Sequence, residues 1–279
     1  MGCAAEVERA VQEGSCGSVD EAQARRQQAA FIYLTFALAS QLSIPGWHRQ
    51  AAALHERLAE FTQCHFGGAG PGPGLRVFDH ECRAITDTGH ADRSPAVIPR
   101  LLEKSQEARQ RGLEIQAAGC FFDALAFANW FGGPQDRERL RAQASPLLEV
   151  VPSEPHPGIR AWWYKALFEA SVADGLFDEA ERLLPEVDGF FRDRPHMLHV
   201  EWAKAMGEFA LRRGDYDEAQ RHFEDGLAAA KRWELEKHSC VCAAWLLNCD
   251  LARKGRPLIN ANTPLKDPAK RQAVIALAR

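Results

Sequence analysis

A ten-residue pattern that occurs twice constrains the fold more than any other feature of the sequence. GLFDEAERLL occupies residues 175–184, and GDYDEAQRHF occupies residues 214–223. In both stretches an aromatic residue stands two positions after the glycine and is followed by Asp-Glu-Ala. Glycine readily adopts the positive φ that ends one helix, and the acidic pair favours the positively polarised start of the next helix. The pattern therefore predicts the turn of a helical hairpin.

Glycines with the same expected role recur along the chain at a nearly constant interval. They stand at positions 89, 133, 175, 214 and 255, so their separations are 44, 42, 39 and 41 residues. A period near 40 with a tight turn in each unit is typical of stacked helical hairpins, because a single hairpin cannot bury its own apolar face. Alternation with a period of two, which would indicate strands, is missing. We therefore expect an all-α solenoid of about five to six antiparallel hairpins.

Glycine- and proline-rich stretches indicate how the chain is divided. Residues 1–18 are small and polar enough to form a flexible N-terminal segment, and residues 19–66 are expected to form an N-terminal helical hairpin. Residues 67–76 contain GGAGPGPG, which predicts a loop because glycine and proline interrupt both helices and strands. The helical repeats would then occupy residues 77–279, with a helix at about 267–278 capping the stack.

The unit at residues 200–227 resembles a tetratricopeptide repeat. The match rests on the small Gly207 in the first helix, on Gly214-Asp215-Tyr216, and on Ala219, Phe223 and the small Gly226. The unit at 161–187 is similar but has bulky Phe168 where the family has a small residue. The resemblance covers about a third of the chain, and the period near 40 is similar to degenerate repeats in sensor regions of bacterial signalling regulators. It implies a right-handed solenoid.

In that family the first helix of each hairpin lines the concave face, where peptides bind. Carried onto this sequence, that register predicts a groove formed by Asp123, Phe127, Trp130, Trp162, Lys165, Glu169, Glu201, Lys204, Glu208, Arg212 and Trp245. Aromatic platforms beside lysines and arginines favour a protein or peptide segment with apolar anchors and some acidic character. The other interpretation is that these residues are core aromatics and solvated charges.

One dense group of cysteine and histidine residues could bind a metal ion. It consists of His238, Cys240, Cys242 and Cys249. On a helix, however, Cys240 and Cys242 point in different directions, and the apolar neighbours Trp245, Leu246 and Leu247 are typical of a core. We interpret the thiols as core residues and expect no metal site.

Other patterns of reactive residues are weaker. His48 with His55, and His196 with His199, have spacings that could pair imidazoles on a helix. Neither pair includes the glutamate of an HExxH motif, so we expect surface or interhelical hydrogen bonds. The sequence contains neither a GxSxG motif nor a phosphate-binding GxxxxGK[ST] motif. We therefore expect no catalytic residues and no cofactor.

Charge and cysteine usage restrict the partners and the compartment. A formal charge of −4 gives no general attraction for nucleic acid, so no nucleic-acid partner is expected. The most apolar run, residues 29–42, has 14 residues, which is too short to span a bilayer. Eight scattered cysteines without a CxxC motif favour a reducing compartment, so we expect a cytoplasmic protein without membrane contact. A homo-oligomer remains open.

Together these features predict a non-enzymatic, regulatory scaffold that binds a protein or peptide in a concave groove. A second hypothesis is a sensor of a small molecule or signalling peptide, in which the ligand changes the shape of the solenoid. A third is an enzyme with a pocket between helices.

Overall fold

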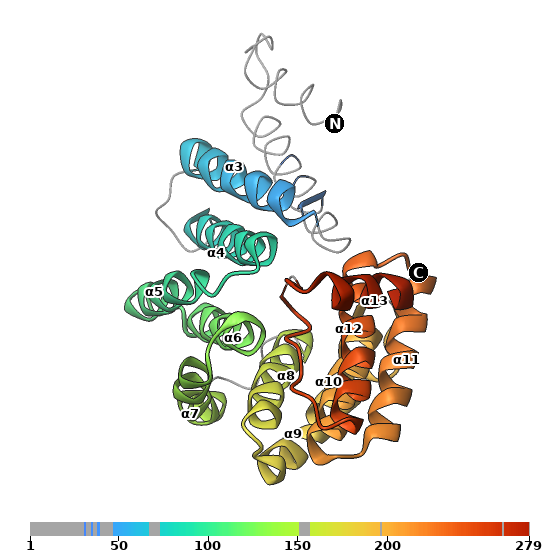
Figure 1. Ribbon diagram of the computed structural model, residues 1–279. Coiled ribbons are helices and arrows are strands. Elements are labelled where there is room, and N and C mark those ends of the chain that lie inside the picture. The colour runs from blue at the N-terminus through green and yellow to red at the C-terminus, as the bar shows by residue number, and fades with distance from the viewer. Residues whose placement is uncertain are drawn as a thin grey trace. The chain divides into compact units, whose positions relative to one another are not determined.

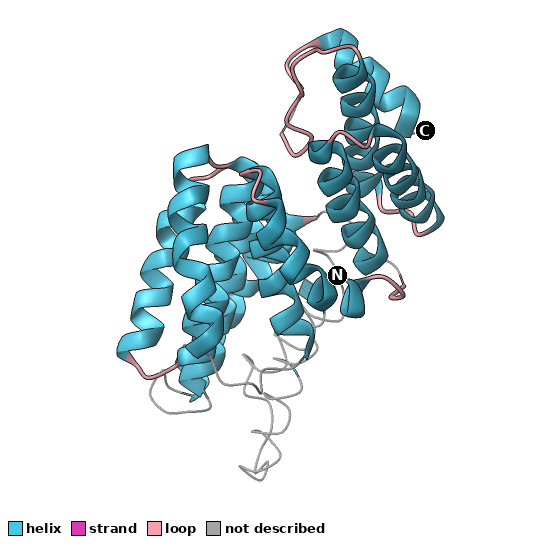
Figure 2. Ribbon diagram, turned by 90° about the horizontal axis from the view of Figure 1, so that it is seen from below, coloured by secondary structure: helices cyan, strands magenta, loops and turns pink. Residues whose placement is uncertain are grey.

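The protein is all-helical in the part of the chain that the computed structural model describes. These residues are 47–66, 73–150, 157–195, 197–263 and 265–278, together with Phe31, Thr35, Leu38 and Ala39. Within them the chain forms eleven helices and no strand. Figures 1 and 2 show these helices. The expected fold class, an α-solenoid of helical hairpins, is confirmed. The predictions for residues 1–18 and for the first helix of the N-terminal hairpin lie outside the described residues.

The chain divides into two compact units, residues 1–88 and residues 89–279. The first unit contains α3 (His48–Phe66) and most of α4 (Pro73–Asp92). Helix α4 begins inside the range expected to be a loop. The Nδ1 atom of His48 lies 2.8 Å from Oδ1 of Asp87, and both side chains are buried. This contact confirms the interhelical hydrogen bond expected for that histidine.

The second unit is a succession of hairpins. Its helices are α5 (Val97–Gln110), α6 (Glu114–Phe131), α7 (Pro134–Val150), α8 (Pro157–Ala173), α9 (Phe177–Phe191), α10 (Met197–Arg213), α11 (Tyr216–Arg232), α12 (Glu236–Arg253) and α13 (Pro268–Ala278). Helices α6, α8, α10 and α12 are the first helices of their hairpins, and neighbouring members of this set pack against one another. The second helices α7, α9 and α11 each pack against the first helix of the following hairpin. Helices α10, α11 and α12 run side by side in Figure 1. Helix α13 packs on α12 at the position expected for the cap.

Glycine ends the first helix in three hairpins as predicted. The φ angle is 74° at Gly175, 87° at Gly214 and 61° at Gly255. At Gly214 the backbone N–H donates to the carbonyl of Leu211, and the next N–H donates to the carbonyl of Ala210, at 3.1 and 3.0 Å. These two bonds form a Schellman motif, in which a left-handed residue lets the last carbonyls of a helix find donors. The side chain of Asp215 then accepts from the N–H of Glu218 and caps α11.

The prediction that Gly89 marks a turn is wrong. Gly89 lies inside α4, and the helix ends at Asp92, just before Arg93, whose φ is 48°. A Cβ atom at position 89 would lie 2.5 Å from Cε1 of Phe127 and 2.7 Å from Cγ2 of Val97. The missing Cβ atom at Gly89 therefore makes room for neighbouring side chains. It does not mark a change of chain direction.

The departure of the 161–187 unit from the family pattern has a packing explanation. In the next unit, a Cβ atom on Gly207 would lie 2.5 Å from the Phe223 ring, which is fully buried and stacks on Trp245. The repeat register puts Phe168 in the place of Gly207, and Leu184 in the place of Phe223. Phe168 is fully buried, and Leu184 packs against the same core cluster. The 161–187 unit thus fills this space from both helices, with Phe168 on α8 and Leu184 on α9, whereas the next unit fills it with Phe223 opposite a glycine.

Candidate binding site

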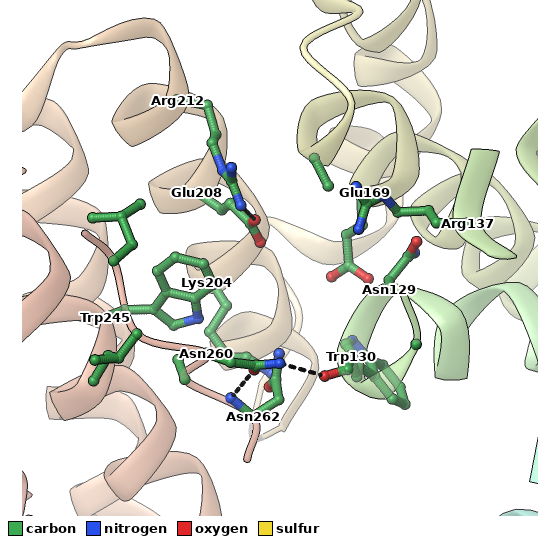
Figure 3. Close-up of a pocket in the computed structure, with 15 residues that line it drawn as sticks. Asn129, Trp130, Arg137, Glu169, Lys204, Glu208, Arg212, Trp245, Asn260 and Asn262 are labelled. Atoms are coloured by element: carbon green, nitrogen blue, oxygen red, sulfur yellow. Dashed lines mark hydrogen bonds and ion pairs between the residues drawn. The ribbon is translucent and has the colours of Figure 1, made fainter. Parts of the chain in front are cut away.

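A cavity of about 370 Å³ lies among the first helices of the 89–279 unit (Figure 3). Helical spacing explains why charged side chains meet there. Lys204, Glu208 and Arg212 stand four residues apart on α10, and Glu169 and Ala173 do so on α8, so each set shares one helix face. The complete lining is Asn129, Trp130, Gly132, Arg137, Glu169, Ala173, Lys204, Glu208, Arg212, Trp245, Leu258, Ile259, Asn260, Ala261 and Asn262.

One wall of the cavity is a segment that follows α12, residues 256–262, which we call the C-terminal strap. Its carbonyl and amide at Ile259 are both hydrogen-bonded by the buried side chain of Asn248, at 2.9 and 2.8 Å. The Nδ2 atom of Asn260 donates to the backbone carbonyl of Trp130 at 3.2 Å, as Figure 3 shows. These bonds hold the strap between α12 and the end of α6, so the cavity is bounded rather than an open groove along its whole length.

Beneath the cavity lies a buried network of charged side chains. Lys165 is 1% exposed, and its ammonium group pairs with Oε1 of Glu169 and, at 3.0 Å, with Oε2 of Glu201. The other oxygen of Glu201 lies 2.6 Å from Nζ of Lys204 and 3.4 Å from Nε2 of His238. Buried charges are tolerated only when they are paired, and this network pairs them between helices α8, α10 and α12.

The pairing fixes the protonation states of the network. Burial alone would lower the pKa of Lys165, but the carboxylates of Glu169 and Glu201 hold it above its ordinary value. Burial would raise the pKa of Glu201, but Lys204 and Lys165 hold it well below the ordinary range. Burial lowers the pKa of His238. Lys165 and Glu201 are therefore charged at neutral pH, and the imidazole of His238 is neutral.

A second set of charged groups stands closer to the opening. Burial raises the pKa of Glu208, Arg212 opposes the rise, and the nearby Glu169 carboxylate adds to it. The Nη2 atom of Arg212 lies 3.3 Å from Oε1 of Glu208, and the Arg212 side chain is 38% exposed. Arg137 is bound through Nε to Oδ1 of Asp174 at 2.7 Å. Figure 3 shows the Glu169 and Glu208 carboxylates on opposite sides of the space.

The structure brings together six of the eleven residues predicted for the groove. They are Trp130, Glu169, Lys204, Glu208, Arg212 and Trp245, and all six line the cavity. Each of these residues comes from the first helix of a hairpin, as the repeat register requires. The predicted binding role of these residues stays a prediction.

The other five predicted residues lie outside the cavity lining. Lys165 and Glu201 are buried beneath it and paired with its walls. Phe127 is 1% exposed and contacts the His90 ring. Trp162 packs edge-on against Phe191, although the Lys165 ammonium lies 5.4 Å from its ring centroid. Asp123 is exposed on α6.

Several lining residues were missed by sequence reasoning. Asn129 is the immediate neighbour of Trp130, but polar residues beside an aromatic platform carry no distinctive pattern. Arg137 lies on α7, a second helix, which the family register assigns to the other face. The strap follows Gly255, the last expected turn glycine, and its residues have no periodic pattern from which their position could be predicted.

The cysteine and histidine group lies largely in the core. His238 faces Glu201, and Cys242 and Cys249 are buried. Burial raises the pKa of Cys242 to about 12 and that of Cys249 to about 11, so both thiols stay protonated. Among the described residues, no three or more His, Cys, Asp or Glu side chains are arranged to hold a metal ion. The interpretation of the thiols as core residues is confirmed for Cys242 and Cys249 and is wrong for Cys240, which is exposed.

The second histidine pair is described in part. His199 Nε2 lies 2.7 Å from Oδ2 of Asp225 on the next helix, and His199 also stacks on Trp202. This contact confirms an interhelical hydrogen bond, whereas His196 lies outside the described residues.

Comparison with known proteins leaves the family open. No protein-family model matches the chain, and a search of curated proteins finds no match. No helix within the described ranges combines the length and the apolar character needed to cross a membrane.

Proposed function

We propose that the protein is a tetratricopeptide-like interaction module whose cavity in the 89–279 unit binds a segment of a peptide or protein. The observation that carries the proposal is the convergence of four successive first helices on one cavity. Trp130 and Trp245 line this cavity beside charged side chains from α8 and α10. Its volume of about 370 Å³ suits one or two side chains of a bound segment.

The tryptophans provide a surface on which an apolar side chain of the bound segment can pack, and the fixed charges determine how that segment is aligned in the cavity. Trp245 is 6% exposed and stacked on Phe223, so it is a rigid platform rather than a mobile side chain. Lys204 and Glu169 are held by the buried network, so their positions are set before a ligand arrives. A preorganised site loses less entropy on binding than a flexible one.

A peptide library with a steric block in the cavity tests the proposal. Peptides selected from a random library against the full chain would be titrated by fluorescence anisotropy into the parent protein and into Ala173→Trp. Ala173 lines the cavity, so an indole there should weaken binding at least tenfold. Ala142→Trp, which adds the same group at an exposed position on α7, should leave affinity unchanged.

Two results would contradict this function. One is that no selected peptide binds the folded protein. The other is that Ala173→Trp retains full affinity while its circular-dichroism melting curve shows a native fold.

The strap supports a second function, a sensor of a small molecule or signalling peptide. The hydrogen bond from Asn260 to the carbonyl of Trp130 joins residues 130 positions apart in the chain. A ligand that fills the cavity would act directly on this bond. Hydrogen exchange of α13, which follows the strap and does not line the cavity, should then change on ligand binding, whereas a passive scaffold would show protection only at the helices and strap residues that line the cavity.

A further inference from the structure

The charged groups around the cavity differ in whether they already have partners, and this difference indicates the chemistry of the ligand. Lys165 and Lys204 are bound by Glu169 and Glu201 at the base of the cavity. Arg137 is held by Asp174. Among the described cavity residues, each lysine and arginine thus has a carboxylate partner, Arg212 pairing with Glu208.

The unmatched groups are hydrogen-bond acceptors. Glu169 is 9% exposed, and its Oε2 atom is buried without a hydrogen-bond partner. The Oδ1 atom of Asn129 is buried and unmatched as well. Its identity as the oxygen follows from the other atom, Nδ2, which donates to the carbonyl of Ala166 at 2.8 Å. Buried acceptors without donors are costly, and both belong to residues that line the cavity.

A third acceptor faces them across the space. The Glu208 carboxylate from α10 lies opposite Glu169 from α8 in Figure 3. Among the described residues its ion-pair partner is Arg212, which approaches to 3.3 Å and is partly exposed. Two carboxylates that face each other across a cavity repel one another, and a cation placed between them would turn this repulsion into attraction.

We infer that the cavity selects a positively charged group of the bound segment, a lysine or arginine side chain or an N-terminal ammonium, which donates to Glu169, Asn129 and Glu208. An ammonium has three donors and a guanidinium has five, which matches a site that offers acceptors. Trp130 and Trp245 line the same cavity, where they can cover the apolar stem or face the cation. This inference rests on the proposed function and names the partner chemistry of that site. It is opposite in sign to the acidic character expected from the sequence.

Small amides of single amino acids show directly whether the cavity prefers a positively or a negatively charged ligand. The probes carry an acetyl group on the α-nitrogen and an amide at the α-carboxyl group, so that only the side chain differs. They are the basic Nα-acetyl-lysine amide and Nα-acetyl-arginine amide, the neutral Nα-acetyl-norleucine amide and the acidic Nα-acetyl-glutamate α-amide. Binding would be followed through the indole N–H resonances of Trp130 and Trp245 in the full chain by NMR titration. We expect the two basic probes to bind at least tenfold more tightly than the neutral and acidic probes.

Isosteric variants then locate the interaction. Glu208→Gln removes the charge and keeps the shape, and it should weaken the basic probes at least fivefold. Glu169→Gln should do the same, but it also removes a partner of Lys165, so its fold must be checked by its melting curve. Glu186→Gln, at an exposed position on α9, is the matched control and should change nothing.

The pH dependence provides a second readout. Glu208 is faced by Arg212 on its own helix, by Glu169 on α8 and by Arg137 on α7, and no charged residue of α12 or the strap lines the cavity. Burial raises the pKa of Glu208, so part of the population is protonated above the ordinary range of a glutamate. A bound cation favours the ionised form, so basic probes should bind more weakly as the pH falls, and Glu208→Gln should flatten that dependence.

Two results would overturn the inference: equal or tighter binding of the acidic or neutral probe, or full affinity of Glu208→Gln for the basic probes. The outcome is separable from that of the proposed function. If library peptides bind in the cavity and Ala173→Trp blocks them, but Glu208→Gln does not, the function stands and this inference fails. If basic amides bind and no peptide does, the proposed function fails instead.

Discussion

Lys165 is the residue on which the charge network of the 89–279 unit depends. Its ammonium group contacts carboxylates from two helices, Glu169 on α8 and Glu201 on α10, and it is 1% exposed. Breaking a buried pair by removing one partner leaves an uncompensated charge, which costs far more than the pair itself contributes.

Lys165→Met should therefore lower the free energy of unfolding by about 3–5 kcal/mol. Lys204→Met should cost less, because Glu201 would keep Lys165 as a partner. Urea denaturation of both variants measures the difference. Equal losses would show that Lys165 has no special place in the network.

Gly207 shows how a single missing Cβ sets the packing of two helices. Because that atom would lie 2.5 Å from the Phe223 ring, Gly207→Ala should destabilise the protein by about 1–3 kcal/mol. Phe223→Leu in the same chain should recover part of this loss, since Phe168 and Leu184 already combine in that way one unit earlier. A double-mutant cycle measures the coupling. A stabilised Gly207→Ala variant, with the usual gain of alanine in a helix, would contradict the packing argument.

At the scale of elements, the turns between helices use one geometry with two different residues. Between α10 and α11 the left-handed position is Gly214, whereas between α11 and α12 it is Glu234, whose φ is 56°. The N–H of Leu235 donates to the carbonyl of Ala230 at 2.8 Å, so the second turn is also a Schellman motif. A side chain in this conformation is strained, and a glycine is not.

Glu234→Gly should accordingly raise the free energy of unfolding by about 0.5–1 kcal/mol, despite the greater freedom of glycine in the unfolded chain. Gly214→Ala should lower it by about 1 kcal/mol or more, because alanine would have to adopt a φ of 87°. Paired thermal melts check both. If Glu234→Gly is less stable than the parent protein, strain is not what distinguishes the two turns.

The turns also show why some elements could be predicted from the sequence and others could not. Gly175 and Gly214 were predicted correctly because a glycine followed by an amphipathic helix is a local signal, and Gly255 was predicted correctly because it continues the repeat period. Gly89 was assigned to a turn because a glycine that admits the Phe127 ring looks the same in the sequence. The difference lies in a contact between residues 38 positions apart, which no local pattern encodes.

At the scale of the whole chain, each of its two units contains a buried histidine that stays neutral. In the 1–88 unit, burial lowers the pKa of His55 to about 4, with Arg83 adding to the effect. In the 89–279 unit, burial lowers the pKa of His238. The unfolded histidines bind protons near pH 6.5 and the folded ones bind them only at lower pH, so the unfolded state binds more protons as the pH falls through 6.5.

Both units should therefore lose stability on acidification from about pH 7.5 to about pH 5, by at most about 1.4 kcal/mol per pH unit for each histidine. At still lower pH the loss should continue, because Glu201 contributes stability above its unfolded pKa that disappears as it protonates. Urea midpoints across this range measure the slope, and His238→Gln should reduce it. An unchanged slope in His238→Gln would mean that its imidazole already titrates normally in the folded protein.

The candidate site shows the same division between local and distant information. The spacing of Lys204, Glu208 and Arg212 placed these residues on one helix face, and the register of first helices brought Trp130 and Trp245 to the same cavity. The strap could not be foreseen, because the bond from Asn260 to Trp130 depends on how far the stack turns over four hairpins. Nor could the sequence show which charges pair with one another, and that pairing determines the proposed sign of the ligand.

Site-directed photo-crosslinking tests the central claim, binding of a segment within the cavity, most directly. The photoreactive residue p-benzoylphenylalanine would replace Leu258, a cavity-lining strap residue that is 37% exposed, or Ala142 on α7 as the control. Irradiation with a labelled, library-selected peptide should give a covalent product at position 258 that an excess of unlabelled peptide removes, and none at position 142. A product at position 142 but not at 258 would contradict the account, because the segment would then bind outside the cavity.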